Sequence, residues 1–237
     1  MRGFTVKYLD KPKRKHNVVY DLEVEDNHNF YVHSVLVHNC LFIAKKKYIS
    51  RVRDEEGIRY PENAPKMKKM GVDLARSAIP RWCREKLEES LNLILDKTES
   101  ELKAWINNIK PEFKEQSVSD IAMNGSVSRV DYSLNDKGIP FMCKAGIYYN
   151  RYITAHKLQD MYPPILANSS VKLMRLINPN PFGTSLIAYN SDNFEKEFKD
   201  YIDYDEQFKK GFLDPVNNMV KILKYDIYSQ TESIDEW

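Results

Sequence analysis

The hydrophobic pattern of the chain changes period near Pro80, and this change limits what the chain can fold into. Up to about residue 60, apolar residues alternate with polar ones, as β-strands require. After Pro80 they recur at helical spacing, with Leu87, Leu91 and Ile94 on one face. Strand-forming and helix-forming segments are therefore separated along the sequence, which predicts an α+β fold.

Five extended segments are predicted in the first part of the chain. The last two flank Asp54-Glu55-Glu56-Gly57, a hairpin loop in which Gly57 takes the left-handed conformation. The first 40 residues are predicted to be all-β, and they are too few to bury a core unaided. The five segments are residues 4–8, 18–24, 30–38, 48–53 and 58–60.

Helices are predicted from residue 81 onward. Thr98-Glu99-Ser100-Glu101 matches a capping box, which begins a second helix. Pro111 is expected to kink or end that helix, because its ring cannot take part in the helical hydrogen bonding. Residues 117–190 are mixed in pattern, and two further helices are predicted near residues 194–202 and 216–223.

Composition excludes several classes of protein. Hydrophobic residues make up 42% of the 237 residues, which is too many for a disordered chain. No uncharged apolar run approaches the ~18 residues of a membrane-spanning helix, and MRGFTVKYLD has no secretory signal pattern. Cys40, Cys83 and Cys143 are odd in number and widely spaced, which fits a reducing compartment. We therefore expect a cytoplasmic location and no membrane partner.

The formal net charge of +2 hides an uneven charge distribution. Nine Lys and Arg side chains lie between residues 45 and 69, whereas acidic side chains dominate from residue 192 onward. This asymmetry predicts that the basic segment between residues 45 and 69 faces a polyanion. The densest cationic cluster would neutralise phosphates without reading base sequence, although a lysine-blunted edge strand is the alternative. The cluster consists of Lys45, Lys46, Lys47 and Tyr48.

Val37-His38-Asn39-Cys40 is the segment most informative about chemistry. The side-chain amide nitrogen of an Asn can attack its own main-chain carbonyl, which forms a succinimide and breaks the chain after that Asn. A neighbouring His can protonate the leaving nitrogen, and positioned groups of this kind contribute ~10²–10⁴-fold. A thiolate at Cys40 could accept an acyl group and then pass it to its own amine. His28 and His33 are available to assist the nucleophile.

Residues 19–30 fit the pattern VYDLxVxxxHxF, and with the His-Asn-Cys junction they resemble the two C-terminal motifs of inteins. The resemblance implies that Asn39 is the cyclising last residue of an intein and that His38 assists it. It also implies that His28 and Asp21 act in the preceding motif and that Cys40 begins the downstream host protein. The N-terminal intein motifs are absent, so a split intein with a partner chain is expected.

Two other hypotheses stay open for this segment. In the first, a metal-binding regulatory module would hold zinc through His28, His33, His38 and Cys40, although their spacing matches no recognised zinc motif. In the second, the motifs are a decayed remnant in a non-splicing, DNA-binding accessory protein. Splicing itself would need no metal and no cofactor.

From about residue 42 to about residue 228, collinear motifs resemble family B DNA polymerases, most closely those of T-even-type phages. Ser77-Ala78-Ile79-Pro80 departs from the Ser-Ser-Thr-Pro usual in that family. The resemblance implies that Lys45, Lys46, Lys47 and Tyr48 contact primer–template DNA. The matching motifs are Ala44-Lys45-Lys46-Lys47-Tyr48, Gly57-Ile58-Arg59-Tyr60, Met70-Gly71-Val72 and Asn180-Pro181-Phe182-Gly183.

The two resemblances together imply three parts. Residues 1–39 would be a C-terminal intein fragment of the Hint type. Residues 40–70 would be the end of a polymerase palm, and residues 71–237 a mainly helical thumb with a C-terminal tail.

They also imply what the chain needs from elsewhere. The Asp-Thr-Asp motif that holds two metal ions in this family is absent. The Mg²⁺ of the assembled polymerase would therefore be bound by a missing N-terminal part, and Asp203-Tyr204-Asp205 is interpreted as surface charge. The implied partners are that N-terminal intein–polymerase half, primer–template DNA and a sliding clamp bound by residues 233–237. The implied setting is a phage-infected bacterium.

Overall fold

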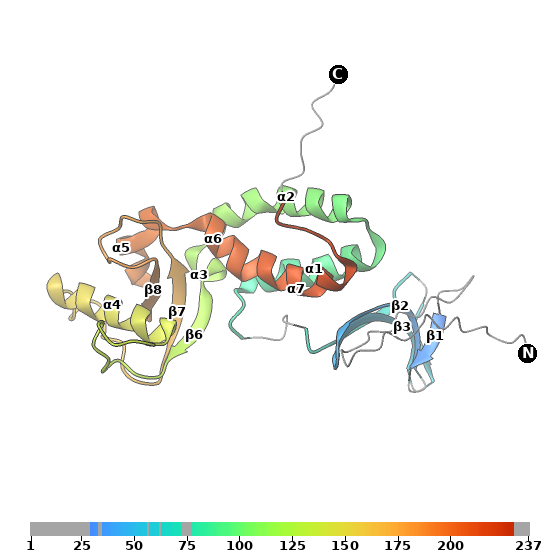
Figure 1. The fold of residues 1–237 in the computed structure, drawn as a ribbon, viewed down its shortest axis with the longest axis horizontal. Coiled ribbons are helices and arrows are strands. Elements are labelled where there is room, and N and C mark those ends of the chain that lie inside the picture. The colour runs from blue at the N-terminus through green and yellow to red at the C-terminus, as the bar shows by residue number, and fades with distance from the viewer. Residues whose placement is uncertain (1–28, 33–34, 56, 62, 73–76, 230–237) are drawn as a thin grey trace, which may run out of the picture.

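The computed structural model describes residues 29–32, 35–55, 57–61, 63–72 and 77–229, with side chains from Cys40 onward. The fold is α+β, as predicted. Two antiparallel sheets lie at opposite ends of the molecule, with a layer of helices between them (Figure 1). The segments predicted at 4–8 and 18–24 lie outside the described residues.

The first sheet contains β1 (Asn29–Val32), β2 (Val35–Ala44), β3 (Lys47–Glu55), β4 (Ile58–Arg59) and β5 (Lys66–Met70). β2 lies between β1 and β3, and β3 pairs on its other side with both β4 and β5. The β3–β4 hairpin confirms the predicted loop, and Gly57 has the predicted positive φ of 85°.

The prediction of one extended segment over residues 30–38 is wrong. Val32 lies opposite Val35 and Asn29 lies opposite His38, so the chain reverses here and forms the β1–β2 hairpin. Extended, β-forming residues continue on both sides of the reversal. Periodicity alone therefore could not reveal the turn.

The two faces of this sheet have different neighbours. Leu41 and Ile49, which lie opposite each other, are buried in the core that continues into α1 (Arg81–Asp96). On the same face the Arg51 guanidinium donates to Asp96 of α1 at 2.6 Å. We call the opposite face, which carries Cys40 and Tyr48, the outer face.

The helical layer is built from an α1–α2 hairpin and a long C-terminal helical segment. Thr98 caps α2 (Glu99–Glu115) as predicted: its N–H donates to Glu101 Oε2 at 3.0 Å, and the Glu101 N–H donates to Thr98 Oγ1 at 3.4 Å. α2 does not end at Pro111. The buried side chains of Ile109 and Phe113 hold this part of α2 in the core, and Pro111 itself is exposed.

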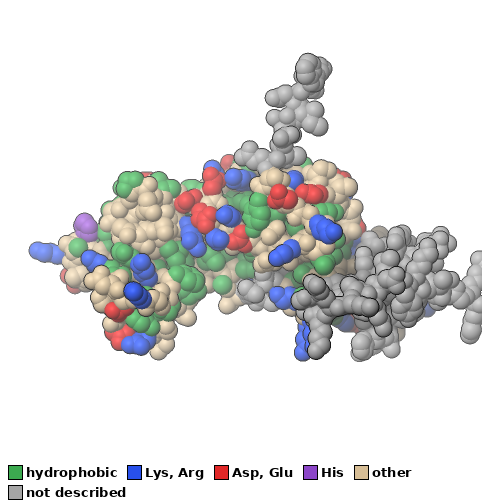
Figure 2. All heavy atoms as spheres, viewed as in Figure 1, with side chains coloured by type: hydrophobic (Ala, Val, Ile, Leu, Met, Phe, Trp, Pro, Cys, Tyr) green, Lys and Arg blue, Asp and Glu red, His purple; other side chains and the backbone are tan. Residues whose placement is uncertain are grey.

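The C-terminal helical segment is longer than the sequence predicted. It comprises α6 (Tyr204–Phe208), a π-helical turn over Lys209–Leu213 and α7 (Asp214–Val220), followed by a 3₁₀ turn to Leu223. Aromatic rings join it to α1 and α2, with ring centroids 5.3 Å apart for Trp82 and Phe113 and 5.2 Å apart for Phe113 and Phe208. Lys, Arg, Asp and Glu side chains are mixed over the exposed face of this layer (Figure 2).

The second sheet has the order β6 (Met123–Val127), β7 (Ser169–Arg175), β8 (Leu186–Tyr189). The long helix α4 (Phe141–Ala155) packs on it and buries Cys143, Ile147 and Tyr149, among others. The short helix α3 (Val118–Ile121) leads into β6. The helix predicted near 194–202 is α5 (Glu195–Phe198) with a 3₁₀ turn on each side.

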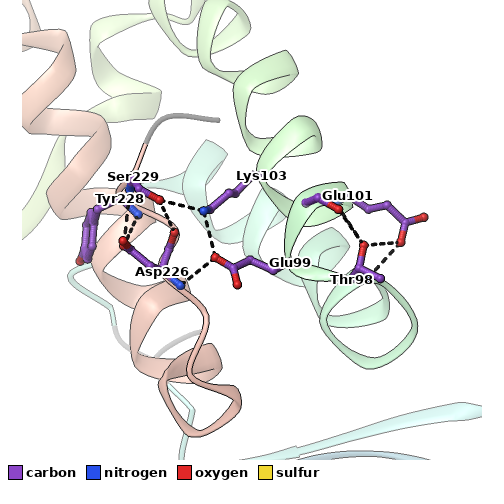
Figure 3. A network of polar contacts seen from close by, with 8 residues as sticks. Thr98, Glu99, Glu101, Lys103, Asp226, Tyr228 and Ser229 are labelled. Carbon is purple, nitrogen blue, oxygen red and sulfur yellow. Dashed lines mark hydrogen bonds and ion pairs between the residues drawn. The ribbon is translucent and has the colours of Figure 1, made fainter. Parts of the chain in front are cut away.

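The C-terminal segment is tied to the beginning of α2, as Figure 3 shows. The Asp226 N–H donates to Glu99 Oε1 at 3.0 Å, and Lys103 Nζ donates to Ser229 Oγ at 2.8 Å. Lys103 also pairs with Glu99 at 2.9 Å. The two contacts therefore belong to one small network that links α2 to the C-terminal segment. The predicted clamp-binding residues 233–237 follow this anchor and lie outside the described residues.

Candidate functional site

The lysine cluster forms the end of a hairpin. Lys45 and Lys46 make the two-residue turn between β2 and β3, and Lys47 begins β3 opposite Ala44. Lys46 takes a left-handed conformation with φ of 61°. All three side chains are exposed. We call Lys45, Lys46 and Lys47 the lysine tip.

Gly71 supports the lysine tip from the end of β5. Its φ is +65°, and a Cβ placed there would collide with the carbonyl oxygen of Lys46 and lie 3.0 Å from Lys47 Cγ. A side chain at this position would therefore push the turn away from β5 as well as strain the backbone.

Replacing Gly71 with Ala is expected to destabilise the fold by more than the ~1–2 kcal/mol of the left-handed conformation alone. Gly57→Ala is the matched control, because Gly57 also has a positive φ but has no atom within 4 Å of the added Cβ. Thermal unfolding followed by circular dichroism measures both variants. Equal destabilisation would show that the close approach to Lys46 is unimportant.

Most of the other basic side chains between residues 45 and 69 have acidic partners. Lys66 and Lys68 both donate to Glu55, at 2.8 and 2.5 Å, and lower the pKa of that carboxyl to about 2. No ion pair joins a lysine of the tip to any other residue that the structure describes. Uncompensated positive charge is therefore concentrated at the tip. The remaining pairs are Arg51–Asp96, Arg59–Asp54 and Lys69–Glu88.

Tyr48 lies on the outer face, in the first row of side chains beside the tip. It pairs in register with Phe42 on β2, and the two ring centroids are 5.9 Å apart. The hairpin thus places Tyr48 directly beside the three lysines of the tip.

The strand β2 crosses the predicted boundary between residues 39 and 40. His38 lies opposite Arg51 and Cys40 lies opposite Ser50, so the register shifts by one residue at Asn39. This is a β-bulge, which leaves one extra residue in the strand; bulges often occur beside active sites. The structure describes Asn39 and His38 by their backbone only, and His28, His33 and Asp21 lie outside the described residues.

Cys40 is half-buried on the outer face. Burial raises the pKa of its thiol to about 11, and the nearby Ser50 hydroxyl offsets this only in part. The thiol is therefore protonated at neutral pH and a weak nucleophile in this arrangement. The acyl-acceptor role expected for Cys40 would need a change in its surroundings.

Asp203 and Asp205, interpreted from the sequence as surface charge, make structural contacts. Asp203 caps α6 by accepting from the Glu206 N–H at 2.9 Å, and Asp205 pairs with Lys110 at 3.1 Å. In the part of the chain that the structure describes, no three His, Cys, Asp or Glu side chains gather as a metal site. Within the same part, no helix has the length and apolarity needed to cross a bilayer.

A cleft of about 670 Å³ lies on the second sheet, beside residues 77–78, and no motif in the sequence indicated it. Its lining includes Asn124, Ser126 and Ser170. Among the described residues that line the cleft, Lys172 is the one basic side chain, and it donates to Asp192 at 2.7 Å. The cleft therefore lacks the unpaired positive charge of the lysine tip.

Comparison with known proteins found two similar polymerases. The chain is 28% identical over 205 residues to the DNA-directed DNA polymerase of Enterobacteria phage T4, and 26% identical over 200 residues to that of Escherichia phage RB69. Each match covers 81% of this chain and 22% of the polymerase, so the chain spans about a fifth of its relatives' length. No family model matches the sequence. The chain therefore contains a region related to these phage polymerases.

Proposed function

We propose that residues 40–237 form the C-terminal part of a DNA-directed DNA polymerase, and that the lysine tip and Tyr48 contact primer–template DNA. The observation that carries this proposal is the lysine tip itself: three exposed cations with no ion pair to a described residue, beside basic residues that are mostly neutralised. Lys and Arg side chains that neutralise phosphates supply the salt-dependent part of DNA affinity. The similarity to the two phage polymerases supports the same assignment.

Polymerisation would require an N-terminal partner. Because the chain spans about a fifth of its relatives' length, the palm carboxylates that hold Mg²⁺ in such enzymes would come from that partner. Among the residues that the structure describes, no three His, Cys, Asp or Glu side chains are grouped so that they could hold a metal ion. In the assembled enzyme, this chain's contribution would be to hold the DNA duplex.

Replacing all three lysines of the tip with Gln is expected to reduce the salt dependence of duplex binding. Each phosphate contact contributes about −0.9 to the slope of log K against log salt, so the slope should become less steep by about 2–3. Fluorescence anisotropy with a labelled primer–template at several salt concentrations measures it.

The matched control for the tip variant is the double variant Lys66→Gln, Lys68→Gln, in which both lysines are already paired with Glu55. Its slope is expected to stay near that of the parent chain. If the slope of log K against log salt becomes less steep by the same amount in both variants, binding depends on the charge of the whole segment and not on the tip. If the parent chain does not bind duplex DNA, the proposal is wrong.

We also propose that residues 1–39 are the C-terminal half of a split intein. The motif residues support this proposal, and so does the bulge that interrupts the β2–β3 ladder at Asn39. Cys40 Sγ would attack the upstream acyl group held as an ester or thioester on the first Cys or Ser of the partner's intein half. A thioester would form at Cys40, and the partner's Cys or Ser would leave with the proton of the Cys40 thiol. Asn39 would then cyclise, the Asn39–Cys40 bond would break, and His38 would protonate the leaving nitrogen, with assistance from His28 and Asp21. A sulfur-to-nitrogen shift would restore a peptide bond at Cys40.

Two rivals differ in what they predict. A non-splicing accessory protein would bind duplex DNA but would not be cleaved after Asn39 by any partner. A zinc module would bind zinc stoichiometrically and lose stability on chelation. Of the four residues in the zinc hypothesis, the structure describes the side chain of Cys40 alone.

A further inference from the structure

We infer that Phe42, Tyr48 and Met70 form one apolar surface that contacts the sugars and base edges of DNA beside the lysine tip. This inference rests on the proposed DNA-binding function and adds two residues that no motif assigned to it. We call the three side chains the apolar row. It would supply a share of the affinity that does not depend on salt.

The strand register places the three side chains in line. Phe42 of β2 lies opposite Tyr48 of β3, and Tyr48 lies opposite Met70 of β5. Residues directly opposite each other in an antiparallel pair share a face of the sheet, so all three are on the outer face. The contact between the Phe42 and Tyr48 rings confirms this arrangement for the first pair.

The row is accessible, unlike the next row of the same strands. Met70 is 47% exposed, and Phe42 and Tyr48 are half-buried. The neighbouring row, on the other face, starts with Leu41 and Ile49, which are buried in the common core. At this end of the sheet, the outer face therefore presents apolar side chains that are not part of the common core.

The position of the row favours a polyanion as its occupant. It is the first row of residues paired across all three strands below the turn formed by Lys45 and Lys46, so a ligand that extends from the tip onto the outer face would contact it. Neither the row nor the tip contains an acidic side chain. Nucleic acid has both required surfaces, with phosphates for the lysines and apolar sugar and base faces for the row; apolar and aromatic side chains contact DNA in this way.

Gly71 fixes the geometry that joins the two surfaces. Because it follows Met70 directly and lies against the Lys46 carbonyl, the tip and the end of β5 cannot separate without loss of this packing. The backbone of the lysine tip and the end of the apolar row therefore lie close together.

The test measures duplex affinity of the full 237-residue chain at several salt concentrations. Met70→Ser and Phe42→Ser are each expected to weaken binding by about 5- to 10-fold at every salt concentration, as for loss of one stacking or apolar contact. The slope of log K against log salt should not change, because no charge is removed. Met70→Leu should keep the affinity of the parent chain.

The matched control is Ile58→Ser, since Ile58 is 61% exposed on the same sheet but lies in β4. Its affinity should equal that of the parent chain. Unchanged affinity of Met70→Ser, or a fall equal to that of the Ile58 control, would overturn the inference. So would variants that bind DNA normally but fail to assemble with the N-terminal partner, because the row would then be a protein interface.

Failure of the inference and failure of the proposed function can be told apart. If the parent chain does not bind duplex DNA, the proposed function fails. If the lysine-tip variant changes the salt slope while the Met70 variant changes nothing, the function stands and the apolar row is wrong. Because Met70 is largely exposed, its variant stays informative even if Phe42→Ser disturbs folding.

Discussion

Asn39→Ala is expected to abolish release of the 39-residue N-terminal piece when the chain is mixed with its N-terminal partner. Ala has no side-chain amide, so no succinimide can form and the bond to Cys40 stays intact. Transfer of the upstream acyl group to Cys40 Sγ does not need Asn39, so a branched thioester should accumulate. Intact-mass spectrometry of the mixture measures the free 39-residue piece, the spliced product and the branched species.

The control for this prediction is Asn29→Ala, which removes a different Asn from the same segment and should leave splicing unchanged. A spliced product from Asn39→Ala would refute the cyclisation mechanism. If the parent chain itself gives no cleavage after Asn39 with the partner, the non-splicing accessory hypothesis is favoured. DNA binding by the parent chain separates that outcome from an unfolded sample.

Phe212→Ala is expected to destabilise the helical layer by about 3–5 kcal/mol, the cost of truncating a fully buried aromatic side chain. Phe212 has no exposed surface, and its ring centroid lies 5.2 Å from that of Phe208 and 6.0 Å from that of Trp105. The cavity would lie where the C-terminal helical segment meets α1 and α2. Urea unfolding followed by circular dichroism measures the change.

Phe141→Ala is the matched control for Phe212→Ala, because Phe141 begins α4 and is 59% exposed. Its effect should stay within about 0.5 kcal/mol. A small effect of Phe212→Ala would mean that the helical segment is not held by its aromatic contacts.

Local chemistry in the sequence predicted several elements correctly, and contacts distant in sequence account for most of the differences. The capping box at Thr98 and the turn at Gly57 depend on a few neighbouring residues, so they could be identified. The continuation of α2 past Pro111 depends on packing of Ile109 and Phe113 against the rest of the helical layer. No local rule contains that information.

The same distinction applies to the candidate site. Lys45–Lys47 and Tyr48 are adjacent in sequence, so a motif can contain them all. Met70 could not be joined to Tyr48 without the β3–β5 register. Nor could the sequence show which basic residues are neutralised, because partners such as Arg51 and Asp96 are 45 positions apart.

The continuous strand β2 has a consequence for the order of events if splicing occurs. Before joining, Val37 and His38 lie opposite Val52 and Arg51 of β3, in positions that the host sequence upstream of Cys40 would inherit afterwards. Residues 35–39 would then pair with β3 only until they are excised. An uncovered edge invites pairing with other chains. Excision would then exchange residues 35–39 for host residues as the pairing partner of β3.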